Sequence, residues 1–214
     1  MALFYQHNIN EHTRLGIWRI EETESFFLEK VPLKKDVSHP YKRLQHLAGR
    51  YLLPTLYKDF PLEEILVADT RKPFLENEQY HFSISHCGNF AAAIVSDRYR
   101  VGVDIEFVTP RLRRIAEKFL HPEEALFLKD WEALSHIHLE LTTLLWSAKE
   151  AIYKWHGEGM MDFKEHMRLS GSIVSAVNDW VTMPFEFRKG TVVPMTVKGR
   201  LFDQLGLAWV VTEV

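Results

Sequence analysis

The chain has 214 residues, of which 46% are hydrophobic and 26% are charged, and its formal net charge is −3. This composition is typical of a globular protein with apolar material for one large core or two smaller ones. The negative net charge argues against a general nucleic-acid-binding protein. The single cysteine, Cys87, excludes an intramolecular disulfide and favours a reducing compartment. Neither a secretory leader nor a membrane span is indicated, so we expect a cytoplasmic protein without membrane contact.

The first half of the chain predicts strands around one helix. Residues 15–20 form an apolar run that predicts a strand, and residues 38–60 have apolar positions at helical spacing. Pro54 is expected to kink or end this helix. Apolar and alternating runs then predict three strands, at residues 80–88, 89–97 and 99–108.

The second half predicts helices followed by strands. A proline at a plausible first helical position opens residues 110–120 and again residues 121–131. A longer helix is expected at residues 140–157, where Gly157 ends it. From about Ile173 onward, turn residues separate several predicted strands. No linker rich in proline or serine divides the halves, and the pattern predicts an α+β fold with two closely joined lobes.

Residues 101–108, "VGVDIEFV", place two carboxylates inside a predicted strand. Residues two apart on a strand share a face, so Asp104 and Glu106 are expected on the same side, next to Gly102. Like charges raise each other's pKa unless a cation compensates them, and carboxylate oxygens are ligands that Mg²⁺ favours. This stretch alone fits equally well an edge strand whose polar face meets solvent or a lysine.

The long predicted helix carries a second group of charged residues. At about 100° per residue, one side collects Trp146, Lys149, Glu150, Tyr153 and Lys154. Aromatic residues beside charges indicate that this side contacts another part of the protein. Glu150 and Lys154 fit either a surface ion pair or a functional pair, and helix geometry alone does not choose between the two.

Three motifs in order, "FSISHCG" at 82–88, "GVDIE" at 102–106 and "WSAKEAIYKWHGEG" at 146–159, resemble the 4'-phosphopantetheinyl transferase superfamily. The likeness is to its two-lobed, monomeric class, which acts on carrier proteins. It implies an α+β fold of two similar lobes related by a pseudo-twofold axis, each a small antiparallel sheet with helices, with the active site between them. We expect an N-terminal lobe at residues 1–103 that binds coenzyme A phosphates. The C-terminal lobe, residues 104–214, is expected to hold a magnesium site and to contact the carrier protein.

The resemblance also implies a reaction and its catalytic residues. The family transfers the 4'-phosphopantetheine arm of coenzyme A to a serine of an acyl or peptidyl carrier protein, with magnesium, and releases adenosine 3',5'-bisphosphate. Asp104, Glu106 and Glu150 would be the magnesium ligands. Glu150 is also the expected base for the serine, directly or through a metal-bound water, and the two roles stay open. Lys154 is expected at the diphosphate, whereas Lys149 would contact coenzyme A or pair with a carboxylate.

The phosphates of coenzyme A need fixed positive charge. By resemblance, Arg43, Arg50 and Lys72 are expected to bind them, since guanidinium and ammonium groups suit phosphate oxygens. His86, with Ser85 beside it, matches the family's histidine that reaches a coenzyme A phosphate. For each single residue, the alternative is a solvated charge or a structural hydrogen bond.

One position departs from the family's pattern. The family usually has glycine before the Lys-Pro step, and this chain has Arg71 there. Arg71 fits either an added phosphate contact or the simple replacement of a turn residue.

The predicted helix at 110–120 is a candidate surface for the carrier protein. It has a basic stripe beside an apolar stripe, a combination that suits docking on an acidic helix but is also common in any half-buried helix. The basic stripe consists of Arg111, Arg114 and Lys118, and the apolar stripe of Leu112, Ile115 and Phe119.

Two other functions remain open at this stage. A magnesium-dependent hydrolase of coenzyme A or of nucleotide pyrophosphates would use the same carboxylates with water as acceptor. A non-catalytic module that binds coenzyme A or a carrier protein would keep the pockets without the reaction.

Overall fold

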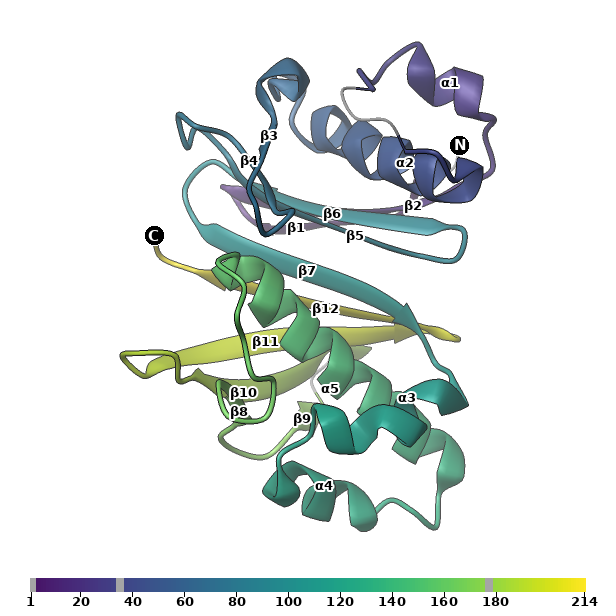
Figure 1. Cartoon of the computed structure of the whole chain (residues 1–214). Coiled ribbons are helices and arrows are strands. Elements are labelled where there is room, and N and C mark those ends of the chain that lie inside the picture. Colours follow the sequence, from purple (N-terminus) through teal and green to yellow (C-terminus); the bar gives the residue numbers. More distant parts are fainter. Residues whose placement is uncertain (1–2, 34–36, 176–178) are drawn as a thin grey trace. The chain divides into compact units, whose positions relative to one another are not determined.

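The computed structural model describes residues 3–33, 37–175 and 179–214. The chain forms two compact units, Met1–Val103 together with Thr212–Val214, and Asp104–Val211. The last three residues, which the sequence analysis assigned to the C-terminal lobe, thus belong to the first unit. Helices and antiparallel sheets occur in both units, and the predicted α+β class is confirmed (Figure 1).

The first unit is built on an antiparallel sheet in the order β1-β2-β6-β5. Strands β2, β5 and β6 correspond to predicted strands, and β6 is almost entirely buried. Strand β1 was not predicted, because its residues alternate between exposed and half-buried positions without an apolar run. The strands are β1 (Leu3–Asn10), β2 (Thr13–Arg19), β5 (His81–Cys87) and β6 (Phe90–Ser96).

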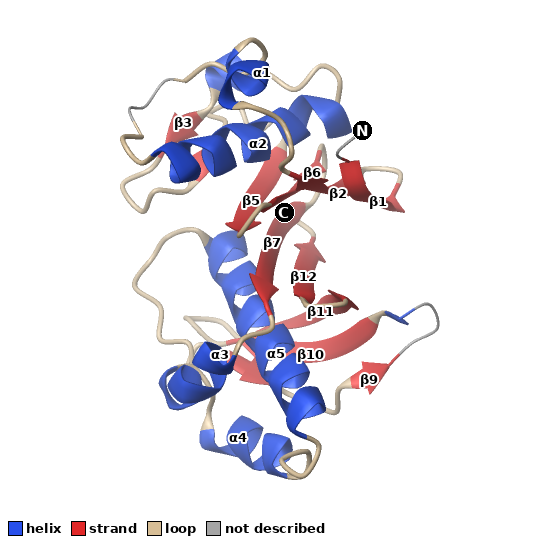
Figure 2. Cartoon of the chain, turned by 90° about the vertical axis from the view of Figure 1, so that its right-hand side faces the viewer, coloured by secondary structure: helices blue, strands red, loops and turns tan. Residues whose placement is uncertain are grey.

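Helix α2 (Pro40–Leu56) packs across this sheet against β2, β5 and β6 (Figures 1 and 2). Pro40 lies in its first turn, and Pro54 lies within its last turn, shortly before the helix ends. Gly49 allows a close approach, since a Cβ at this position would lie 2.5 Å from Cγ2 of Ile84 on β5. The core between helix and sheet includes Leu47 and Leu52, both fully buried. A short helix, α1 (Glu24–Leu28), packs on α2.

A small hairpin follows α2. Its elements are the 3₁₀ helix η1 (Leu62–Glu64) and the paired strands β3 (Leu66–Val67) and β4 (Pro73–Phe74). The hairpin loop includes Arg71, whose φ of 68° lies in the left-handed region. Glycine adopts this region without the steric cost that a Cβ brings, which explains why a glycine suits this position.

The second sheet has the order β7-β12-β11-β10-β8, and β9 pairs with β10. Strand β7 runs across the boundary at residues 103 and 104, so its second half, with Asp104 and Glu106, belongs to the second unit. The strands are β7 (Arg100–Phe107), β8 (Met167–Leu169), β9 (Val174–Ser175), β10 (Val181–Phe187), β11 (Val193–Phe202) and β12 (Leu205–Thr212).

Helix α5 (Ser135–His156) is the main helix of the second unit and packs on β11. Its apolar side faces the core of this unit: Leu144, Leu145 and Ile152 are among its buried residues. Gly157 caps the helix in the left-handed conformation, with φ 79°.

The helices before α5 are shorter than predicted. The segment expected as one helix at 110–120 is α3 (Pro110–Ile115) followed by the 3₁₀ turn η2 (Ala116–Lys118). Helix α4 (Pro122–Lys129) has the expected proline start and a capping box between His121 and Glu124. Helix α5 begins five residues earlier than the sequence pattern indicated.

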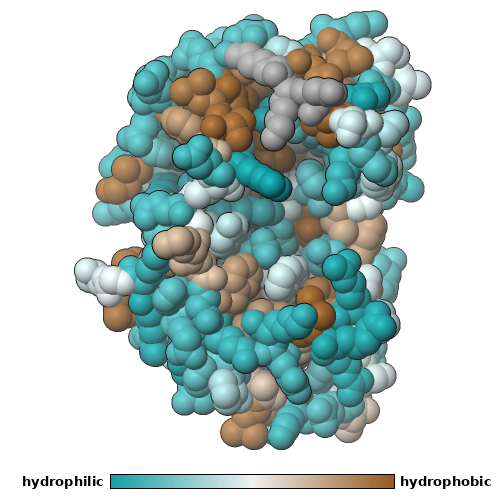
Figure 3. Space-filling model, viewed as in Figure 1, coloured by the Kyte–Doolittle hydropathy of each residue, from teal (hydrophilic) through white to brown (hydrophobic). Residues whose placement is uncertain are grey.

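The surface is mostly polar on the face that Figure 3 shows, where apolar residues form separate patches. Met160, in the segment after α5, is 90% exposed. Among the residues that the structure describes, we find no helix with the length and apolar character that a bilayer span requires.

Candidate functional site

Four charged side chains from two elements of the second unit form what we call the acidic cluster: Asp104 and Glu106 on β7, and Glu150 and Lys154 on α5. The ammonium group of Lys154 donates to Oδ1 of Asp104 at 2.7 Å. Asp104 is only 5% exposed. A buried carboxylate with a charged partner is costly to desolvate, and such pairs are frequent at functional sites.

Local structure accounts for this arrangement. Asp104 and Glu106 are two residues apart on β7 and therefore project from the same side of the strand. Glu150 and Lys154 are four residues apart on α5, one turn along the same helical face. The sequence left open whether Lys154 forms a surface ion pair with Glu150. In the structure, the short contact of Lys154 is with Asp104 on β7.

The electrostatic consequence falls on Glu150. Burial, with smaller contributions from the carboxylates of Asp104 and Glu106, raises the pKa of its carboxyl group to about 7 against the opposing effect of Lys154. The cluster thus has three carboxyl groups and one ammonium group.

The residues fit a divalent cation by their chemistry. Carboxylate oxygens are the ligands that Mg²⁺ favours. A bound cation would lower the pKa of Glu150, which the neighbouring carboxylates raise. In the described part of the chain, however, no group of three or more His, Cys, Asp and Glu side chains is arranged as a metal site. Lys154 donates to Asp104 in this arrangement and supplies positive charge beside the carboxylates.

Lys149 lies elsewhere, although it precedes Glu150 in the sequence. Its side chain is fully buried, and its ammonium group donates to Oε2 of Glu124 at 2.6 Å and to the carbonyl oxygens of Phe119 at 2.8 Å and Phe163 at 2.9 Å. Three acceptors use all three ammonium protons. The expected contact with coenzyme A is therefore not available to this side chain, and the alternative, a carboxylate partner, is the arrangement observed.

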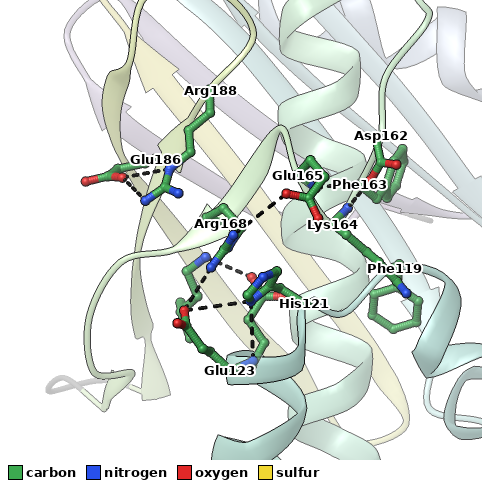
Figure 4. A network of polar contacts seen from close by, with 12 residues as sticks. Phe119, His121, Glu123, Asp162, Phe163, Lys164, Glu165, Arg168, Glu186 and Arg188 are labelled. Carbon is green, nitrogen blue, oxygen red and sulfur yellow. Dashed lines mark hydrogen bonds and ion pairs between the residues drawn. The ribbon is translucent and has the colours of Figure 1, made fainter.

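Glu124 completes this buried pair. Its Oε2 also accepts from the backbone of His121 at 2.8 Å, and its Oε1 accepts from the backbone of Leu169 at 2.8 Å. Figure 4 shows the surrounding network, in which the neighbouring residue Glu123 instead pairs with Arg168 at 2.8 Å. Burial lowers the pKa of Lys149, while the carboxylate of Glu124 opposes this shift. The pair joins α4, α5, β8 and the segment after α5 from inside the unit.

The first unit contains a pocket of about 630 Å³, which we call the α2 pocket. This volume is within the usual range for small-molecule sites. Its lining includes Ile84 and His86, which share one face of β5, and it runs along one side of α2. Six basic or histidine side chains line it: His39, Lys42, His46, Arg50, Arg71 and His86.

Arg50 shows why this pocket suits an anion. Burial lowers the pKa of its guanidinium group to about 10, and no carboxylate contributes to the shift. Its contact is with a histidine, since Nη1 lies 3.0 Å from Nδ1 of His46. A partly buried cation without an acidic partner is costly, and a bound phosphate would compensate it.

The other residues expected at the phosphates lie outside the α2 pocket. Arg43 donates from Nε to Glu24 at 2.9 Å and from Nη1 to the carbonyl oxygen of Val37 at 3.1 Å. Lys72 lines a different pocket of the first unit, together with Arg100. Ser85 is buried, and because side chains alternate along β5 it projects away from the face of Ile84 and His86.

Three pocket residues were missed by sequence reasoning: His39, Lys42 and His46. Together with Arg50 they follow the spacing i, i+3, i+7 and i+11, which places them along one face of α2. That basic stripe was present in the sequence, but it lies next to the apolar stripe that predicted the helix.

Comparisons with known proteins agree with the motifs. The family model of the 4'-phosphopantetheinyl transferase superfamily matches residues 100–183. The 4'-phosphopantetheinyl transferase gsp of Aneurinibacillus migulanus is 32% identical over 129 residues, 58% of this chain and 52% of that protein. The 4'-phosphopantetheinyl transferase AcpT of Escherichia coli K12 is 33% identical over 133 residues, 58% of this chain and 64% of that protein.

A third relative, the enterobactin synthase component D of Escherichia coli K12, is 33% identical over 116 residues, 53% of this chain and 54% of that protein. The match thus spans less than two thirds of the length of each of these relatives. The segment that fits the family model contains all four residues of the acidic cluster. Residues 100–183 of this chain are therefore similar to the 4'-phosphopantetheinyl transferase superfamily.

Proposed function

We propose that this protein is a 4'-phosphopantetheinyl transferase that uses coenzyme A and magnesium to modify a serine of an acyl or peptidyl carrier protein. The observation that carries the proposal is the acidic cluster, in which three carboxyl groups and Lys154 meet and the pKa of Glu150 is raised to about 7. The similarity to named transferases supports the same reaction. We further propose a cytoplasmic monomer, with the phosphate-binding role in residues 1–103 and the metal and carrier roles in 104–214.

The reaction forms one bond and breaks one. The serine oxygen attacks the phosphorus that bears the pantetheine arm, and the bond from that phosphorus to the bridging oxygen breaks, releasing adenosine 3',5'-bisphosphate. Glu150 is the proposed base, because a carboxyl group with a pKa near neutrality accepts the hydroxyl proton most effectively. Lys154 is proposed to neutralise the leaving phosphate.

Asp104, Glu106 and Glu150 are the proposed ligands of Mg²⁺. When bound, the cation would supply charge stabilisation to a diphosphate that gains negative charge as its bond breaks. Asp104 would then share its charge between the cation and Lys154. Near pH 7, Glu150 carries a fractional negative charge, so it can serve as a base, as a ligand, or in both roles.

The α2 pocket is the proposed site for the phosphates at the nucleotide end of coenzyme A. Arg50 and His86 line it together, and among the described residues no carboxylate contributes to the pKa shift of Arg50. Arginine binds phosphate oxygens in pairs, which suits a terminal phosphate group. We make no proposal for Lys149 or Ser85 at coenzyme A, because both are buried away from this pocket.

The carrier protein is proposed to dock on the basic side of α3 and its 3₁₀ extension. Arg111 and Arg114 on α3 are exposed, and Lys118 borders an apolar pocket of about 330 Å³ with Phe119 and Trp146. Basic groups around an apolar pocket suit an acidic helix with an apolar side chain.

Mass spectrometry of an apo-carrier protein separates the candidate functions. The purified protein is incubated with coenzyme A, Mg²⁺ and the carrier, and transfer adds the arm, about 340 Da, to the carrier. A hydrolase would consume coenzyme A and leave the mass of the carrier unchanged. A non-catalytic module would leave both unchanged. Either of the last two outcomes, across a panel of carriers, would contradict the proposal.

A further inference from the structure

The loop that joins β3 and β4 has a geometry that favours glycine at residue 71. The backbone nitrogen of Ala68 donates to the carbonyl oxygen of Lys72 at 2.9 Å, and that of Arg71 donates to the carbonyl oxygen of Ala68 at 2.8 Å. Three residues, 69–71, thus lie between a closing pair, and the third adopts φ 68°. Three-residue hairpin loops usually place a glycine at this left-handed position.

The arginine therefore adds backbone strain that glycine would avoid. A Cβ in the left-handed region lies too close to the following carbonyl oxygen, and strain of this kind is often found at functional sites. The turn requires the backbone conformation only, so the side chain of Arg71 must supply any compensating benefit.

The side chain of Arg71 adds positive charge to a pocket that is already basic. Arg71 lines the α2 pocket together with Arg50 and His86. Arg50 has a pKa lowered to about 10 by burial, with no carboxylate among the causes. The side chain of Arg71 is exposed, so solvent screens its repulsion of Arg50, and the two guanidinium groups together favour a bound anion.

We propose that Arg71 is a further phosphate-binding residue of the α2 pocket and raises the affinity for the bisphosphate end of coenzyme A. This inference rests on the proposed function, from which the ligand class is taken. A planar guanidinium group on a short hairpin can donate two parallel hydrogen bonds to phosphate oxygens, a geometry that a glycine at the same position cannot supply.

The substitution Arg71→Gly tests the proposal, because it removes the charge and relieves the strain together. We expect the thermal unfolding temperature to stay the same or to rise. The dissociation constants of adenosine 3',5'-bisphosphate and of coenzyme A, measured by titration calorimetry, are expected to rise about tenfold or more, in line with the loss of a charge-assisted bidentate contact. An unchanged affinity would show that Arg71 is only a turn residue.

Glu78→Gly is a matched control. Glu78 also has a left-handed backbone, with φ 51°, in the same unit, and it lines the pocket of Lys72 instead of the α2 pocket. This variant relieves a comparable strain and should bind adenosine 3',5'-bisphosphate as the wild type does. If both variants lost affinity for adenosine 3',5'-bisphosphate to the same extent, the loss would come from a general change in the fold, and the proposed role of Arg71 would be wrong.

The binding experiment and the transfer assay test different proposals, so either one can give a negative result without the other. Adenosine 3',5'-bisphosphate lacks the arm that is transferred, so its binding reports on the α2 pocket alone. A wild type that binds it, and loses affinity on Arg71→Gly, supports the inference even when no carrier protein is modified. A wild type that does not bind it overturns the inference even when transfer occurs.

Discussion

The α2 pocket of the first unit and the acidic cluster of the second are opposite in charge and alike in one respect. The pocket has six basic or histidine side chains, and burial alone shifts the pKa of its Arg50. The cluster has three carboxyl groups with one lysine, and burial together with the neighbouring carboxylates raises the pKa of Glu150. In each region the groups of one sign are in excess among the described residues, which favours a ligand of opposite sign. The proposed ligands, the phosphates of coenzyme A and a divalent cation, have these signs.

The buried pair of Lys149 and Glu124 is the instructive contrast. It too is charged and buried, but its charges balance and all its short contacts are made within the second unit. A charge that is satisfied from within stabilises or specifies the fold, whereas an unbalanced charge marks a ligand site. The neighbouring residues Lys149 and Glu150 therefore have different roles.

The largest expected effect is in the acidic cluster. Asp104→Asn and Glu150→Gln each lower the negative charge that would hold the cation, and we expect the transfer rate to fall by about a thousandfold or more. Circular dichroism should show an intact fold in both. The matched control is Glu123→Gln, an exposed carboxylate of the same unit, which should retain the wild-type rate. Near-normal turnover in Asp104→Asn would contradict the proposed metal site.

Breaking the buried ion pair of Lys149 and Glu124 is expected to lower the free energy of unfolding strongly. Lys149→Met leaves the carboxylate of Glu124 buried without its cation, and loss of one partner of a buried ion pair costs about 3–5 kcal/mol of unfolding free energy. Replacing both, as in Lys149→Met with Glu124→Leu, should recover much of that loss because no unpaired charge remains. Urea unfolding measures both variants. A double variant no more stable than the single one would show that the pair is not a balanced unit.

In the α2 pocket, the expected effect is on coenzyme A binding. Arg50→Met removes the partly buried guanidinium group and should raise the KM for coenzyme A by about ten- to a hundredfold, with a smaller change in kcat. Arg43→Met is the matched comparison on the same helix, since Arg43 already donates to Glu24 and to a carbonyl oxygen. Equal increases in the two variants would remove the distinction between a ligand-binding and a structural arginine.

The sequence predicted those parts of the fold in which one pattern dominates. Helix α5 and strands β5 to β7 have strong periodicity, and their motif residues Asp104, Glu150 and Lys154 lie together as the pattern indicated. Strand β1 alternates between half-buried and exposed residues and has no apolar run, so it was not recognised.

The errors at the site have a common geometric cause. A helical wheel grouped Lys149 with Glu150, yet adjacent residues are about 100° apart, and Lys149 points to Glu124 inside the unit. Along β5, Ser85 and His86 alternate between faces, so only one of them reaches the α2 pocket. Sequence motifs select residues near a site, but the direction of each side chain depends on its long-range partner.

The smallest expected effect is the pH dependence that Glu150 gives the metal-free protein. Its pKa is about 7 in the folded state, against 4.5 for the unperturbed group. As the pH rises above 4.5, the unfolded chain releases this proton first, so stability falls until about pH 7 and then stays level. The loss is at most roughly 3 kcal/mol, and screening by solvent reduces it to about 1–2 kcal/mol.

Glu150→Gln removes this titration while Asp104, Glu106 and Lys154 remain. With a chelator present, the variant should be more stable than the wild type at pH 8, by about 1–2 kcal/mol, and nearly equal at pH 4.5, because both side chains are then neutral. Urea unfolding at the two pH values measures the difference. Mg²⁺ should stabilise the wild type more than the variant at pH 8, because the cation compensates the charge that the fold leaves unbalanced. A variant that is less stable than the wild type at pH 8 without metal would mean that the carboxylates are balanced from within, and the contrast with Lys149 and Glu124 would disappear.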